Sequence, residues 1–114
     1  DGVLSVVDIA AGQVLYQKLL DVNLDNHHNM KAARGLGSSP ALAGKYIYIF
    51  GNQGTAVVLE PGRTFKQVAK NRLENSIGHD EWWGHQESSI SSPVFDGDRL
   101  YYRAEANLYC IGGK

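Results

Sequence analysis

The chain has 114 residues, of which 43% are hydrophobic and 20% are charged, a size and composition typical of one small globular domain. Wholesale disorder is excluded, because it requires low hydrophobicity and high net charge. The net charge of −1 provides no overall field for nucleic acid, and no apolar run approaches the roughly 20 residues of a membrane span. The single cysteine, Cys110, excludes an internal disulfide, and the start at Asp1 without an initiator Met indicates a processed segment.

The first segment predicts a β-hairpin. Residues 3–9 form a β-rich run that ends at a turn signal over residues 10–12. Residues 13–20 then read as the returning strand. A helix is the competing interpretation of 13–20, because its leucines also fit a helical stripe. The short connection through Gly12 favours the strand.

Further short strands follow along the chain, separated by turns rich in glycine. They are predicted over 45–50, 55–60, 64–70, 99–103 and 108–111. No segment carries a long helical pattern with caps. The sequence therefore predicts an all-β protein.

An internal repeat organises these strands. Residues 38–48, which begin Ser-Ser-Pro and continue through Gly to Tyr, recur 53 residues later as 91–101. A second element occurs at 2–8, 54–60 and 106–112, with a spacing of 52 residues. Two elements that recur in the same order indicate duplicated structural units.

Each unit reads as a four-stranded antiparallel meander, which is the blade of a β-propeller. Residues 38–73 form one full blade, residues 1–20 the end of a preceding blade and residues 91–111 the start of the next. The whole chain, 1–114, is then a single propeller segment with about two blades' worth of strands.

The repeat resembles that of quinoprotein-like, or PQQ-like, β-propellers. The residues that carry the resemblance are Ser-Ser-Pro-x-x-x-Gly-x-x-x-Tyr and, from Gly2 to Tyr16, Gly-x-Leu-x-x-x-Asp-x-x-x-Gly-x-x-x-Tyr. The family usually has Trp where Tyr16 stands, and residues 60–70 lack this spacing altogether. Catalytic members bind pyrroloquinoline quinone with calcium and have a disulfide between adjacent cysteines, which the lone Cys110 cannot form.

Non-catalytic relatives include bacterial envelope assembly scaffolds. The resemblance therefore implies an extracytoplasmic, bacterial-type scaffold that binds a protein or a small ligand, without a cofactor and without enzymatic activity of its own. The alternative is part of a PQQ- or metal-dependent oxidoreductase whose active centre lies in absent blades. Open blade edges predict self-association, unless residues 13–20 close the full propeller by completing its final blade.

Two insertions between units are the candidate functional loops, because connections longer than about 12 residues are often functional. They span 24–36 and 74–90, and equivalent connections lie on one face of a propeller. The candidate ligand-binding residues are His27, His28, Trp82 and Trp83. The two tryptophans would stack on a ligand; alternatively, they wedge between blades in place of the missing Trp.

A metal site is the second hypothesis for these loops. His79 and His85 lie near acidic residues, and imidazole with carboxylate suits Zn, Ni or Mn. Their spacing matches no helical ligand motif, so histidines in solvent are the alternative.

No catalytic residue is predicted. Cys110 stands where other units have Val6 and Val58, so we expect a small buried hydrophobic residue. The repeated serines predict hydrogen bonds at strand starts. Residues 51–54 lack the Lys-Ser/Thr ending of a phosphate loop and predict a hairpin turn.

Overall fold

The computed structural model describes residues 2–22, 36, 38–51, 54–73, 91–104 and 107–112. These residues form strands, turns and extended segments, and no helix occurs among them. The strands are β1 (Val3–Asp8), β2 (Gln13–Leu19), β3 (Ala41–Ala43), β4 (Tyr46–Phe50), β5 (Thr55–Leu59), β6 (Gln67–Arg72), β7 (Val94–Asp96), β8 (Arg99–Arg103) and β9 (Leu108–Gly112).

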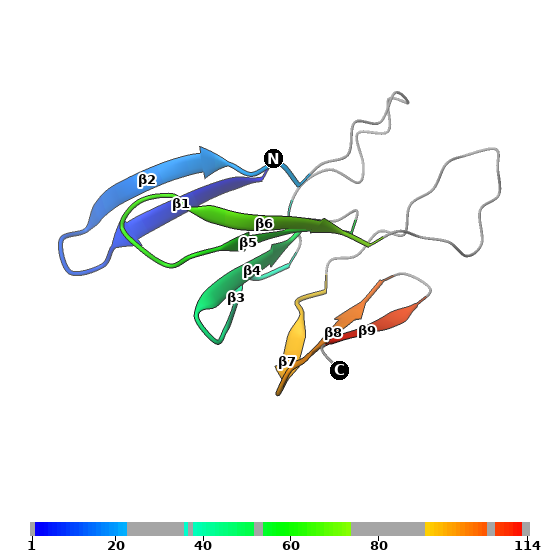
Figure 1. Ribbon diagram of the computed structural model, residues 1–114. Coiled ribbons are helices and arrows are strands. Elements are labelled where there is room, and N and C mark those ends of the chain that lie inside the picture. Colours follow the sequence, from blue (N-terminus) through cyan, green and yellow to red (C-terminus); the bar gives the residue numbers. More distant parts are fainter. Residues whose placement is uncertain are drawn as a thin grey trace, which may run out of the picture.

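Every paired strand is antiparallel, which confirms the all-β, antiparallel prediction. The strands form a two-stranded sheet (β1-β2), a four-stranded sheet (β3-β4-β5-β6) and a three-stranded sheet (β7-β8-β9), each a simple meander (Figure 1). Within the described part of the chain none of these sheets closes on itself. Residues 13–19 of the segment 13–20 form the strand β2, so the helical interpretation is wrong.

The start of β6 differs from the sequence prediction. The strand begins at Gln67, three residues later than expected, because the turn after Pro61 is wide. The N–H of Glu60 donates to the carbonyl of Lys66 over 2.9 Å and closes this turn. Phe65 leaves the strand path to pack against the core and meets Tyr16 edge-to-face, with ring centroids 6.2 Å apart.

The four-stranded sheet packs against the two-stranded sheet through one of its faces. A first core lies here, and its members are at most 2% exposed. They are Leu20, Val22, Ile49, Val57 and Leu59. Gly51 allows the close approach, because a Cβ at this position would lie 2.7 Å from the carbonyl oxygen of Val22.

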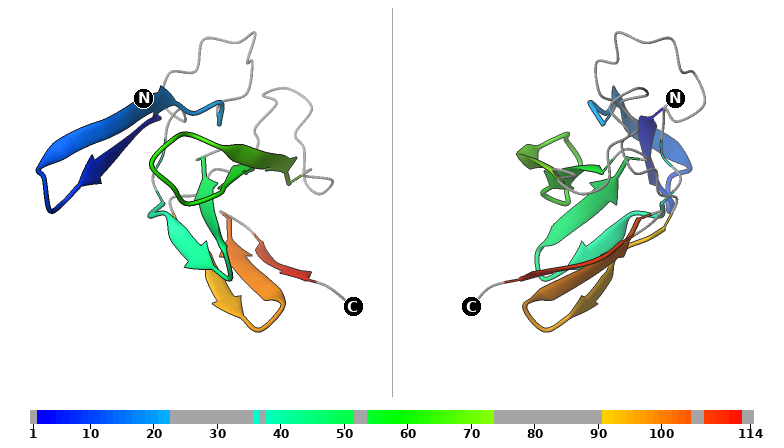
Figure 2. Two further views of the ribbon diagram at one scale, coloured as in Figure 1. Left: turned by 60° about the vertical axis from the view of Figure 1, so that its left-hand side comes forward. Right: turned by 90° about the vertical axis from the view of Figure 1, so that its right-hand side faces the viewer.

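The opposite face of the four-stranded sheet packs against the three-stranded sheet. The second core contains Phe50, Ala56, Tyr102 and Ala104. The rings of Phe50 and Tyr102 stack with centroids 4.4 Å apart and an interplanar angle of 22°. The three sheets therefore form a stack with the four-stranded sheet in the middle, as the views of Figure 2 show.

The sequence repeat is visible in the hydrogen bonds. The N–H of Leu20 donates to the carbonyl of Gly2 over 2.8 Å, and the N–H of Leu73 donates to the carbonyl of Gly54 over 3.0 Å. Each leucine follows the last strand of its sheet and packs toward a core. The two units thus end in the same local structure.

The stack is open rather than spherical. Its radius of gyration is 15.2 Å, above the roughly 13 Å of a compact domain of about 100 residues. Each core lies between two neighbouring sheets, so its buried side chains depend on contacts between sheets.

Phe50→Ala removes the ring that joins the four-stranded and three-stranded sheets. We expect it to lower the free energy of unfolding by about 3–5 kcal/mol, measured by urea denaturation. Tyr46→Ala is the matched control, because Tyr46 lies on the same face of β4 but outside both cores. Equal losses in the two variants would contradict a specific role for the stacked rings.

Asp8 predicts a pH-dependent stability. Its Oδ1 accepts hydrogen bonds from the N–H groups of Ala10 and Ala11, and its Oδ2 pairs with Arg63 at 3.0 Å. The N–H of Ala11 and then the Arg63 guanidinium lower the pKa of Asp8. Its contribution is therefore present at neutral pH and is lost as the pH falls from about 3.9, the unfolded value, through the folded pKa.

The measurement is thermal unfolding of wild type, Asp8→Asn and Asp8→Ala from about pH 7 to about pH 2. Asp8→Asn should lose less stability than wild type over this acid range. At neutral pH we expect Asp8→Ala to be less stable than Asp8→Asn, because the amide oxygen still accepts from the turn N–H groups. Parallel acid profiles for wild type and Asp8→Asn would refute this role of the carboxylate.

Candidate functional site

The predicted site residues lie outside the described residues. These are His27, His28, Trp82 and Trp83, predicted to bind a ligand, and His79 and His85, predicted to bind a metal. The described residues that flank the two insertions belong to the sheets or lie beside them.

Those flanking residues meet at one end of the four-stranded sheet. Val22, before the first insertion, lies against Gly51, and Ser38, after it, donates through Oγ to the carbonyl of Phe50 over 2.8 Å. Leu73, before the second insertion, bonds to Gly54. Both insertions consequently leave the fold at the end of the sheet that carries the β4–β5 turn.

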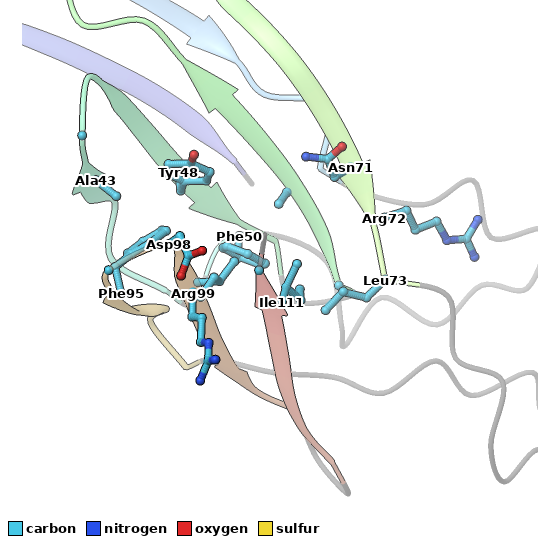
Figure 3. Close-up of a pocket in the computed structure, with 16 residues that line it drawn as sticks. Ala43, Tyr48, Phe50, Asn71, Arg72, Leu73, Phe95, Asp98, Arg99 and Ile111 are labelled. Carbon is cyan, nitrogen blue, oxygen red and sulfur yellow. The ribbon is translucent and has the colours of Figure 1, made fainter. Parts of the chain in front are cut away.

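A cleft of about 580 Å³ lies between the four-stranded and three-stranded sheets. Its aromatic wall contains Tyr48, Phe50 and Phe95, and the rings of Tyr48 and Phe95 have centroids 4.8 Å apart. Leu73, directly after β6, and Ile111, on β9, line it as well, as Figure 3 shows. The cleft therefore reaches the residue from which the second insertion departs.

The cleft is mainly apolar, although charged residues belong to its lining. The side chains of Arg72 and Arg99 extend away from the aromatic group in Figure 3. Asn71 and Asp98 are the further polar side chains in the lining. Such a combination of apolar walls with a few polar groups is typical of binding sites.

β9 forms one border of this cleft and is the edge strand of its sheet. It corresponds in the repeat to β5, which pairs with β6 on its far side. An edge strand offers backbone donors and acceptors to an added strand. The four-stranded sheet has a further strand, β6, beside β5. Among the described residues, the three-stranded sheet has no such strand beside β9.

Most of the cations near β6 are paired within the molecule. Lys66 pairs with Glu60 at 2.7 Å, and this hydrogen-bonded ion pair lowers the pKa of Glu60 and raises that of Lys66. Lys70 pairs with Asp21. Carboxylates of the same chain therefore balance the charges of Lys66 and Lys70 on this segment, and no nucleic-acid ligand is needed to do so.

The buried position predicted for Cys110 is wrong. Its thiol is exposed, whereas Val58 at the equivalent repeat position is 5% exposed. Val58 is on the face of the four-stranded sheet that the three-stranded sheet covers. Cys110 lies on the far face of the three-stranded sheet, where no described sheet packs.

The repeated serines make the hydrogen bonds predicted at strand starts. Besides the bond from Ser38, the Oγ of Ser92 accepts from the N–H of Ser39 over 2.9 Å and links two units. The described residues contain no group of three or more metal-binding side chains. They also contain no helix of the length and apolar character that crossing a membrane requires.

Comparisons with protein-family models and with curated protein sequences give no significant match. The cleft was not anticipated from the sequence. The only signal for it was the dense aromatic run over residues 46–50, which strand propensity alone explains.

Cys110 should react readily with a thiol reagent in dilute, native protein. We expect labelling by Ellman's reagent at close to the rate of a small free thiol, because exposure controls access to the sulfur. The reference is the same reaction in denaturant. Labelling that becomes complete only after unfolding would show that the thiol is covered.

Proposed function

We propose that the chain is part of a quinoprotein-like β-propeller and acts as a non-catalytic scaffold. Its ligand is an extended segment of a partner protein, which binds in the cleft beside β9. The repeat of the sequence and the stack of meandering sheets support the propeller assignment. An extracytoplasmic location belongs to the same proposal and rests on the resemblance.

The observation that carries the proposal is the apolar cleft beside an edge strand. An added strand on β9 would gain backbone hydrogen bonds, and alternate side chains would enter the cleft on the side that Ile111 and Leu73 line. The cleft supplies selectivity, because an apolar side chain gains burial against Ile111 and Leu73.

A peptide of residues 64–73, which contains β6, is the probe. It is the strand that pairs with β5, the repeat equivalent of β9. We expect it to bind the intact chain and to shift the backbone NMR signals of β9 and Leu73. A scrambled peptide of the same composition controls for charge.

Two variants on β9 separate the cleft from the rest of the strand. Ile111 lines the cleft, whereas Leu108 is 71% exposed and is absent from the lining. Ile111→Lys should weaken peptide binding at least about tenfold, and Leu108→Lys should leave it unchanged. No binding of the peptide, or equal affinities for both variants, would overturn the cleft as the binding site.

A further inference from the structure

The stack of sheets ends in two exposed apolar faces. At one end, the outward residues of the two-stranded sheet include Val3, Val7, Val14 and Leu19, which are 47–64% exposed. Val3 pairs with Leu19 and Val7 with Val14, so each pair shares this outer face. Ser5 and Gln17 form the cross-strand pair between these two apolar pairs. Both side chains are neutral, and Gln17 donates to the Oγ of Ser5 over 3.1 Å.

The opposite end of the stack has an apolar row, flanked on the same face by the charged residues Asp96, Arg99 and Arg103. Val94, Tyr101 and Cys110 lie in register across the three strands of the three-stranded sheet. Val94 is 62% exposed, Leu108 in the next row is 71% exposed and Cys110 is exposed. Exposed apolar patches of this kind mark interaction sites more often than single surface hydrophobic residues do.

The second of these faces repeats a surface that is covered elsewhere in the molecule. Ala41, Tyr48 and Val58 lie in register across the four-stranded sheet, and this face packs on the three-stranded sheet. The repeat spacing places Val94, Tyr101 and Cys110 at the same positions. This row of the three-stranded sheet therefore corresponds to one that a further sheet of the repeat covers, although Arg99 and Arg103 stand where the four-stranded sheet has Tyr46 and Phe50.

The first face is its counterpart. Val3 and Val7 correspond in the repeat to Thr55 and Leu59, which are buried on the four-stranded sheet at 1% and 2% exposure. Leu59 belongs to the core between that sheet and the two-stranded sheet. One end of the chain thus carries the covering surface and the other end the surface to be covered.

We propose that these two faces bind each other between copies of this chain, head to tail. The three-stranded sheet of one copy packs on the outer face of the two-stranded sheet of the next. Such an interface is heterologous, so it adds copies into rings or longer arrays instead of stopping at a symmetric dimer. It uses sheet faces, in contrast to the open strand edges that the sequence suggested.

Sedimentation velocity over a wide concentration range tests this proposal with two variants. Val14→Lys blocks the first face and Leu108→Lys blocks the second, and both positions are exposed, so the fold is retained. Wild type should associate, whereas each variant alone should associate at least about tenfold more weakly. Ile9→Lys is the matched control, because Ile9 is 95% exposed but lies in the β1–β2 turn.

Mixing the two variants gives the decisive result. Each retains the face that the other lacks, so an equimolar mixture should form a dimer and nothing larger. In that dimer the Cys110 thiol of the Val14→Lys copy is covered, and that of the Leu108→Lys copy still reacts. Half of the thiols should therefore become protected from Ellman's reagent.

Three results would overturn the proposal. One is a monomeric wild type at all concentrations, as expected if these faces take a different partner. Another is association of either variant alone at wild-type strength, as expected for pairing of strand edges or of like faces. The third is a mixture that stays monomeric.

Discussion

The arrangement of the whole molecule depends on β5, the strand whose five residues are all buried. Val57 and Leu59 contribute to the core on one face of its sheet, and Ala56 contributes to the core on the other. A strand buried on both faces needs a sheet on each side. The two-stranded and three-stranded sheets meet this need, and each gains a partner for one of its own faces.

The sequence predicted the strands well because local signals determine them. Glycine turns and β-branched runs placed six of the nine strands within about one residue of their observed bounds, and the Ser-Ser-Pro repeat located β3 and β7. It did not predict the start of β6, since packing of Phe65 against a distant core lengthens the turn. The errors arise where contacts between units override local preference.

The candidate site was harder to predict for the same reason. The cleft lies between two sheets, and no spacing of residues within one unit encodes how those sheets are placed relative to each other. Cys110 shows the related error: equivalence with Val58 implied burial, but burial also requires a neighbouring sheet. The histidines and tryptophans of the insertions, which were predicted to bind a ligand or a metal, lie outside the described residues.

Gly51 makes its repeat unit structurally different from the unit that follows it. Val22 lies so close to this glycine that a methyl group would meet both its carbonyl oxygen and its Cβ, at 2.7 Å and 2.8 Å. The repeat places Ala104, which already carries that methyl group, at the same position of the next unit. An array designed by concatenating the glycine-bearing unit would keep the tight spacing between neighbouring sheets. An array built from the alanine-bearing unit would need a wider spacing, so the two halves of this duplicated chain are no longer exchangeable parts.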